Sequence, residues 1–227
     1  MKGKKRKSVI LANTKWGLTP FGRKGVRPLQ VFVLLFVVYS LVRLPVAFAA
    51  PLLVDDFEGA TNKLGGRSNV YVSEPSRALA VRSKENPHGG TGVLMIKYDK
   101  KAKGGPYDSG GWCGYYTSLK SGPRYFDATG YQTITFWVRG ATGSENFVVG
   151  LSDHHWDEVG DSVKSEAIGK YLPGGKLTTE WQKATVPLAT FMLDMKELAS
   201  IAICFEGSLF PDGAGQGTVY IDDVVLE

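Results

Sequence analysis

From residue 51 to the end of the chain, apolar residues come in short runs and keep no helical spacing. β-branched and aromatic residues dominate the runs, and Gly, Pro, Asn and Asp separate them, as is typical of strands joined by turns. Only residues 190–199 could form a helical turn or two. We predict strands at 52–58, 70–73, 93–98, 113–119, 133–139, 147–152, 181–188, 201–205 and 218–226.

Many short strands at this spacing predict an all-β fold, a two-sheet antiparallel β-sandwich of jelly-roll type. Apolar residues alternate along 134–138 and along 201–205, so we expect these side chains in the core between the sheets. Trp137 and Trp181 could be ligand platforms, but packing against the sandwich is the simpler interpretation. One such domain fills residues 50–227.

Charge is divided unevenly along the chain. Residues 1–49 hold ten of the 27 basic residues and no acidic residue, which leaves 17 basic against 22 acidic residues in the remainder. The Lys and Arg residues of that remainder are dispersed, whereas phosphate binding needs a clustered basic patch. We therefore expect no nucleic-acid partner.

The first 49 residues resemble an export signal. A basic region is followed by an apolar run at 31–42 and then by Ala47-Phe48-Ala49, the small-x-small pattern that signal peptidase requires. Cleavage after Ala49 would release a mature domain of residues 50–227. We expect this domain to be secreted, periplasmic or at the cell surface.

An uncleaved membrane anchor is the alternative. A membrane span needs about 20 apolar residues, and Arg43 and Pro45 end this apolar run early. We therefore expect no stable membrane insertion after cleavage.

The residues that catalysis would need are sparse. The only histidines are His88, His154 and His155, and the sequence has no H-E-x-x-H, G-x-S-x-G or P-loop motif. Acidic residues crowd positions 153–161, a pattern typical of a solvated loop. We predict that the chain is not an enzyme.

Carboxylates interrupt the apolar strands predicted at the two ends of the domain. Asp56 and Glu58 lie in the first strand and Asp222 in the last, and buried carboxylates are costly unless paired or bound to a cation. If the two strands meet, the three side chains would converge beside the loop at 89–92, and oxygen ligands of this kind suit a structural calcium ion. The alternative is a solvated edge whose charges prevent strand-to-strand aggregation.

Four segments form a pattern that extends in order over nearly all of residues 52–227. They are Asp55-Asp56-Phe57-Glu58-Gly59, Ile134–Gly140, Glu180–Phe191 and Tyr220-Ile221-Asp222-Asp223. These segments resemble the family 11 carbohydrate-binding modules and the wider galactose-binding-like jelly rolls. A related pattern occurs in the domain of the complex I intermediate-associated protein 30 family.

The resemblance implies a cleft on one sheet, where aromatic and acidic side chains hold a glucan. Trp112, after Gly110-Gly111, matches a cleft tyrosine of the family, and Asp161 and Asp194 match cleft aspartates. Phe205 falls where the family has another tyrosine, and Ala199 where it has another aspartate. The family's ligand preference therefore does not carry over, and a different glycan, or none, stays open.

Two further aromatic residues complete the set of candidate glycan-binding residues. Trp156, flanked by His and Asp, suits stacking on a sugar ring if its loop lies at the rim of the sheet. The alternative is that it folds over the end of the sandwich. What decides is whether Trp112, Tyr116 and Trp156 line one open groove or are buried in the core.

The sequence thus favours a secreted, non-catalytic, calcium-stabilised module that binds a polysaccharide or other glycan. The alternative is a protein–protein interaction or assembly factor on the same scaffold. A hydrolase would need two carboxylates facing each other across a cleft, about 5 to 9.5 Å apart.

The two cysteines are tied to the direction of Trp112. Neighbouring side chains of a strand point to opposite faces, so an outward Trp112 places Cys113 in the core. Cys204 lies between two expected core residues and should point outward. Cysteines on opposite sides of a sheet are too far apart for a disulfide, so we predict two free thiols.

Overall fold

The computed structural model describes residues 49–120 and 122–227, so the predicted export signal, apart from Ala49, lies outside the described residues. Among the described residues no helix is long and apolar enough to cross a membrane. The strands are β1 (Leu52–Asp55), β2 (Ser68–Val72), β3 (Arg77–Ser83), β4 (Val93–Lys100), β5 (Cys113–Ser118), β6 (Thr133–Gly140), β7 (Val148–Asp153), β8 (Val163–Ala167), β9 (Gln182–Pro187), β10 (Leu198–Cys204) and β11 (Gly215–Leu226). The short helices are η1 (Pro106–Asp108), α2 (His154–Val159), η2 (Ile168–Tyr171), η3 (Leu188–Thr190) and η4 (Gly207–Leu209).

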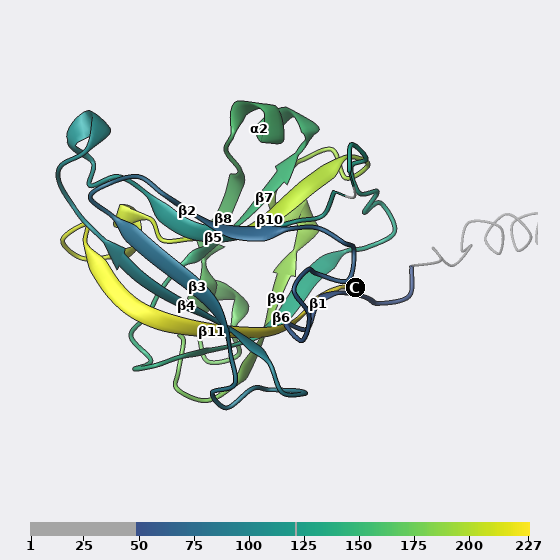
Figure 1. Ribbon diagram of the computed structural model, residues 1–227, viewed down its shortest axis with the longest axis horizontal. Helices are drawn as coiled ribbons and strands as arrows, with labels where there is room; N and C mark the ends of the chain where they lie inside the picture. The colour runs from purple at the N-terminus through teal and green to yellow at the C-terminus, as the bar shows by residue number, and fades with distance from the viewer. Residues whose placement is uncertain (1–48, 121) are drawn as a thin grey trace, which may run out of the picture. The chain divides into compact units, whose positions relative to one another are not determined.

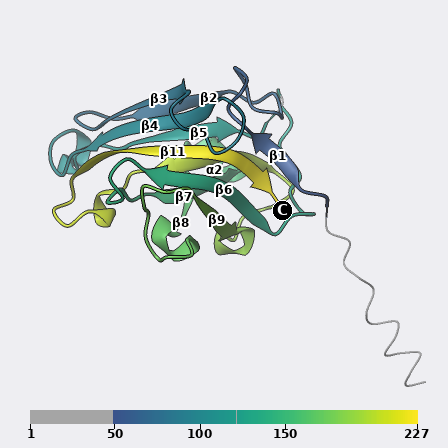
Figure 2. The same cartoon turned by 90° about the horizontal axis from the view of Figure 1, so that it is seen from below.

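The strands form two antiparallel sheets, which Figure 1 shows as two layers. The six-stranded sheet has the order β3-β4-β11-β6-β9, with β1 paired to β11 (Figure 2), and the five-stranded sheet has the order β2-β5-β10-β7-β8. The first and last strands of the domain pair through Leu52 and Leu226. The prediction of an all-β, two-sheet antiparallel sandwich is confirmed.

The core lies between the two sheets and follows the predicted alternation. Ile134, Phe136 and Val138 are buried on the inner face of β6. Phe205 is also buried, with its ring stacked on Tyr98 at 3.8 Å between centroids. The cleft tyrosine that the resemblance placed at position 205 is therefore replaced here by a core residue.

Both cysteines are free and buried. Cys113 belongs to the main core, whereas Cys204 packs with Val148 and Ala202 on the outer face of the five-stranded sheet, beneath Tyr71. The prediction of two free thiols on opposite sides of a sheet is confirmed.

The sequence pattern did not predict three elements, β3, β8 and α2, and one expected element is wrong. β3 contains two Ala and two Arg residues, and β8 contains Lys, Ser, Glu and Ala, so the strand propensity of both is weak. Their pairing with β4 and β7 overrides this weak propensity. The acidic segment expected as a loop contains α2. The expected helical turns at 190–199 do not form, because the 3-10 turn η3 ends at Thr190 and β10 begins at Leu198.

Trp137 and Trp181 pack against the loop between β3 and β4. His88 of that loop stacks on Trp137 at 3.8 Å between ring centroids, and the Trp181 indole donates a hydrogen bond to the Asn86 carbonyl. The packing interpretation of these two residues holds.

Candidate functional site

The outer face of the five-stranded sheet is the best candidate for a binding surface. Along β5, Tyr115 faces the core and Tyr116 faces outward, 36% exposed. Ala202 of β10 lies opposite Tyr116, and Gly150 of β7 lies opposite Ala202. Small residues thus border the Tyr116 ring on this face.

Neighbouring side chains leave little room for a Cβ atom at position 150. A Cβ atom there would lie 2.6 Å from Ser162 Oγ and 3.0 Å from Cys204 Sγ. Beyond it, Ser152 and Ser200 share a hydrogen bond of 2.7 Å between their hydroxyls. This part of the face therefore carries only small side chains, two of which have hydroxyl groups.

Trp112 lies immediately before β5 and is 46% exposed. Its neighbour Cys113 faces the core, so alternation turns the Trp112 ring outward, toward the same side as Tyr116. Four residues along a strand span roughly 13 Å. Two exposed aromatic rings therefore stand on one face at the spacing of a few sugar units.

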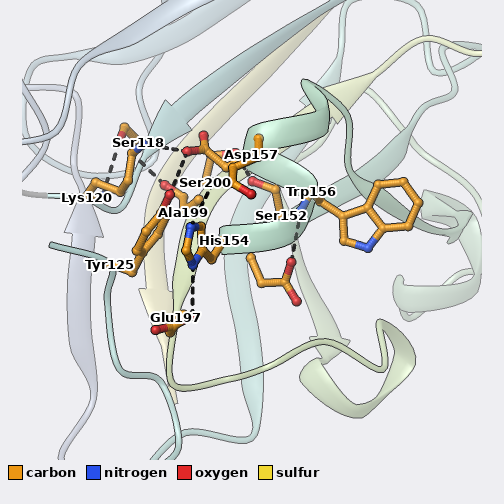
Figure 3. Close-up of polar contacts among 12 residues, drawn as sticks. Ser118, Lys120, Tyr125, Ser152, His154, Trp156, Asp157, Glu197, Ala199 and Ser200 are labelled. Carbon is orange, nitrogen blue, oxygen red and sulfur yellow. Dashed lines mark hydrogen bonds and ion pairs between the residues drawn. The ribbon is translucent and has the colours of Figure 1, made fainter. Parts of the chain in front are cut away.

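The short helix α2 rises beside this face (Figure 3). Asp153 caps its first turn by accepting a hydrogen bond of 3.1 Å from the backbone N–H of Trp156, and Gly160 ends the helix in a left-handed conformation. The second carboxylate oxygen of Asp153 accepts the backbone N–H of Asp194 at 3.1 Å. One buried carboxylate thus joins α2 to the segment that leads into β10.

Contacts from the loop between β5 and β6 hold α2 near the end of β5. Asp157 accepts hydrogen bonds from Lys120 Nζ at 2.5 Å and from the Tyr125 hydroxyl at 3.2 Å. The Lys120 ammonium also lies 5.0 Å from the centroid of the Tyr125 ring, a cation–π contact. The hydrogen bond to Asp157 raises the pKa of Lys120 above its ordinary value.

His154 extends this set of contacts to Glu197, in the loop that leads into β10 (Figure 3). Its ring stacks on Tyr125 at 4.6 Å between centroids, and its two nitrogens lie 3.2 Å from Glu197 and 3.2 Å from Glu158. The hydrogen bond with Glu197, followed by that with Glu158, raises the pKa of His154. Each of these carboxylates already has a partner, so none of them stands free as an acid or a base.

Of the predicted glycan-binding residues, Trp112 and Tyr116 lie on the outer face of the five-stranded sheet, whereas Trp156 projects from α2. The Trp156 ring is half-buried and points away from Tyr125 and His154 in Figure 3. It makes an edge contact with His155 at 5.5 Å between ring centroids. The structure thus brings two of the three aromatic candidates onto one sheet face and mounts the third on the adjoining helix.

The two acidic candidates have other contacts. Asp161 is exposed and forms an ion pair of 2.6 Å with Lys164. Asp194 is exposed, and its side chain accepts the backbone N–H of Lys196 at 2.9 Å. Ala199, at the expected position of a further acid, is buried.

The three predicted metal ligands do not form a metal-binding group. Within the described parts of the chain, no three His, Cys, Asp or Glu side chains cluster around a common point. β1 ends at Asp55, so Asp56 and Glu58 lie beyond the strand, and Asp56 forms an ion pair of 2.7 Å with Lys63. The expected convergence of all three carboxylates is therefore wrong.

Glu58 and Asp222 do lie beside the loop that contains residues 89–92, as expected, but this loop offers them N–H groups. Glu58 accepts the backbone N–H groups of Thr91 at 2.6 Å and Gly92 at 2.7 Å, and Asp222 accepts that of His88 at 2.9 Å. Hydrogen bonds from Thr91 lower the pKa of Glu58. Because these oxygens already accept N–H groups, this donor set does not fit calcium as arranged, and the calcium ion stays a sequence-based prediction.

Sequence reasoning missed the contacts around α2. Lys120 and Tyr125 lie on no predicted strand, and nothing in the local sequence links them to Asp157, 37 and 32 residues later. The one available signal was Asp153 followed by a short run without Gly or Pro, which is the pattern of an N-cap.

The structure is an antiparallel two-sheet sandwich with exposed aromatic rings on one sheet, an architecture that carbohydrate-binding modules share. The family model of carbohydrate binding domain 30 matches residues 56–227, and the chain belongs to this family. The expected kinship with carbohydrate-binding modules is thus confirmed. No curated protein sequence matches the chain.

Solved structures share the fold at low sequence identity. A family 30 carbohydrate-binding module is 18% identical with a TM-score of 0.58, and the alignment covers 80% of this chain and 89% of that one. A family 11 module from Clostridium thermocellum, in complex with a β-1,3-1,4-mixed-linked tetrasaccharide, is 15% identical with a TM-score of 0.57, covering 78% and 96%. A β-1,2-glucanase from Parabacteroides distasonis is 17% identical with a TM-score of 0.51, but only 25% of that chain is covered.

Proposed function

We propose that residues 50–227 act as a non-catalytic glycan-binding module, with the outer face of the five-stranded sheet as its binding surface. The observation that carries this proposal is the pair of exposed rings, Trp112 and Tyr116, on one face of the sheet. Aromatic rings stack on the apolar faces of sugars, and nearby hydroxyls exchange hydrogen bonds with sugar hydroxyls. Family membership supports the same function.

The absence of catalysis is part of the proposal, and the partners of the acidic side chains support it. Asp157 is neutralised by Lys120, and His154 lies between Glu158 and Glu197. A glycosidase needs two carboxylates that are free to act on opposite sides of a glycosidic bond. Calcium is left out of the proposal, because the carboxylates expected to bind it accept backbone N–H groups.

Polysaccharide pull-down and a glycan array on residues 50–227 test the proposal. The panel includes mixed-linked β-1,3-1,4-glucan, because the family 11 structure holds a fragment of it. Trp112→Ala and Tyr116→Ala should each lose about 1 to 3 kcal/mol of affinity, a magnitude taken from base stacking on aromatic rings. Both variants should stay folded, because neither ring belongs to the core between the sheets.

Leu79→Ala is the matched control. Leu79 is 54% exposed on the outer face of the six-stranded sheet, so its truncation should leave glycan affinity unchanged. A wild-type domain that binds no polysaccharide in the panel would overturn the proposal. Unfolding of Trp112→Ala would instead show that Trp112 is a packing residue.

A protein–protein interaction role is the second candidate, and the exposed residues of β3 favour it. Leu79 and Val81 leave apolar side chains on the outer face of the six-stranded sheet, at its edge. Such exposed apolar area is a common feature of interaction surfaces. Cross-linking of the tagged domain in its native envelope, compared with a Leu79→Lys variant, would test this role.

Export is also part of the proposal, supported by the basic, apolar and small-residue pattern of residues 1–49. Terminal sequencing of the exported protein should give Ala50 as the first residue. Recovery of the full chain in the membrane fraction would favour the uncleaved anchor.

A further inference from the structure

Tyr107 combines full exposure with an unfavourable backbone conformation. It is 92% exposed and has a backbone φ of 65°, within the left-handed region that residues other than glycine rarely adopt. A tyrosine ring that contacts almost nothing contributes no packing energy that would offset this cost. The folded domain alone therefore gives no reason for an aromatic residue at this position.

The loop around Tyr107 is firmly held at its base. The buried Lys100 ammonium donates hydrogen bonds to the carbonyls of Lys101 at 2.7 Å and Ser109 at 2.9 Å. The N–H of Gly110 donates to the carbonyl of Gly104 at 2.9 Å, which closes the loop at its neck. The loop thus presents Tyr107 in a defined position.

A second contact fixes the tip of the loop. Asp108, which also has a positive φ of 49°, accepts the backbone N–H of Gly104 at 2.7 Å through its side chain. An ordered backbone beneath an exposed ring reduces the conformational entropy that the loop loses when the ring binds a ligand. This is the property expected of a residue that makes a preformed contact.

The loop stands on the side of the proposed glycan-binding face. Figure 1 shows η1, the coil at the upper left, rising beyond the five-stranded sheet on the same side as α2. The loop then leads directly into Trp112, the first exposed ring of that face. η1 and α2 therefore flank the outer face of the five-stranded sheet.

We propose that Tyr107 is a further glycan-contacting residue, a side wall whose ring stacks on a sugar of a chain bound along Trp112 and Tyr116. This inference rests on the proposed function. A chain long enough to pass Trp112 would meet the η1 loop, so the ligand class is a polysaccharide or an oligosaccharide of several units. Mono- and disaccharides would bind without this contact.

Tyr107→Gly gives opposite expectations for stability and for binding. Glycine adopts positive φ freely, so the melting temperature of the variant should equal or exceed that of the wild type. Its Kd for the polysaccharide identified by the array should rise about 3- to 10-fold, the effect of losing one aromatic contact. Tyr107→Phe should retain most of the affinity, because the stacking ring remains.

Asn86→Gly is the matched control. Asn86 is exposed and has a positive φ of 50°, but it lies in the loop between β3 and β4, on the opposite side of the sandwich in Figure 1. This variant should also keep or gain stability, and its glycan affinity should equal that of the wild type.

The outcomes separate this inference from the proposed function. If wild type binds, Tyr116→Ala weakens binding and Tyr107→Gly does not, the role of Tyr107 is refuted and the module function stands. If wild type binds no polysaccharide, both fail. An affinity loss in Tyr107→Gly together with a lowered melting temperature would show a structural role for the tyrosine and would also overturn the inference.

Discussion

Removal of the Asp153 side chain tests how α2 is held on the sandwich. Asp153 is 8% exposed, and its two oxygens accept the N–H groups of Trp156 and Asp194, both at 3.1 Å. Loss of an N-cap costs about 1 kcal/mol, and loss of a hydrogen bond to a charged acceptor costs about 1.5 to 3 kcal/mol. Asp153→Ala should therefore lower the free energy of unfolding by about 2.5 to 4 kcal/mol.

Two further variants separate the cap from the link. Asp153→Ser keeps a capping oxygen for Trp156 but is too short to reach the N–H of Asp194, so it should lose about 1.5 to 3 kcal/mol. Asp194→Ala keeps the backbone N–H that Asp153 accepts, so its unfolding free energy should change by less than about 0.5 kcal/mol. Both expectations depend on the two backbone N–H groups whose hydrogen bonds Asp153 accepts.

Urea unfolding, followed by tryptophan fluorescence and by circular dichroism, measures these differences. In a domain of this size, 1 kcal/mol shifts the melting temperature by about 2 to 4 °C, so Asp153→Ala should melt about 5 to 15 °C lower. A loss below about 1 kcal/mol for Asp153→Ala would refute the joint role of the carboxylate. Equal losses for the Ala and Ser variants would refute the cap.

Three other predictions concern the thiols, calcium and pH. Burial raises the pKa of Cys113 and Cys204 to about 11, so both thiols should resist a thiol reagent at pH 8 until denaturant is added; fewer than two reactive thiols in denaturant without reductant would indicate oxidation. Chelator and added calcium should leave the melting temperature unchanged, because Glu58 already accepts N–H groups, whereas an ion at a hundredfold excess over its Kd would add about 2.7 kcal/mol. The raised pKa of His154 gives stability that is fully present below its ordinary pKa of about 6.5 and is lost as the pH rises through the higher folded value. The difference in melting temperature between wild type and His154→Gln should therefore shrink from pH 6 to pH 8.5, and a difference independent of pH would contradict the contact with Glu197.

The alternation of side chains along a strand made much of the fold predictable. The core positions in 134–138 and 201–205 follow from a period of two, and so do the opposite directions of Trp112 and Cys113. β3 was not predicted because its Ala-Leu-Ala sequence favours a helix in isolation. Its seven residues become a strand through pairing with β4, which supplies the missing backbone partners.

The candidate site could be predicted only in part. The exposed rings of Trp112 and Tyr116 could be predicted from the local pattern and the family resemblance, because both depend on the alternation of side chains along one strand. The partners of the carboxylates were not accessible. Glu58 receives its hydrogen bonds from Thr91 and Gly92, more than 30 residues later, and no local pattern records such a contact.

The sequence by itself determined nine of the eleven strands that the structure describes, the face that the core residues of 134–138 and 201–205 take and the two free cysteines, because these depend on short-range periodicity. Only the tertiary structure decided which charges neutralise one another and where α2 and η1 stand. Lys120 follows β5 and Asp157 lies in α2, which follows β7. Because β5 and β7 both pair antiparallel with β10, they end at the same end of the sheet, and there Lys120 and Asp157 meet. Such a meeting depends on the path of the whole backbone, since a hydrogen bond requires its atoms within about 3 Å.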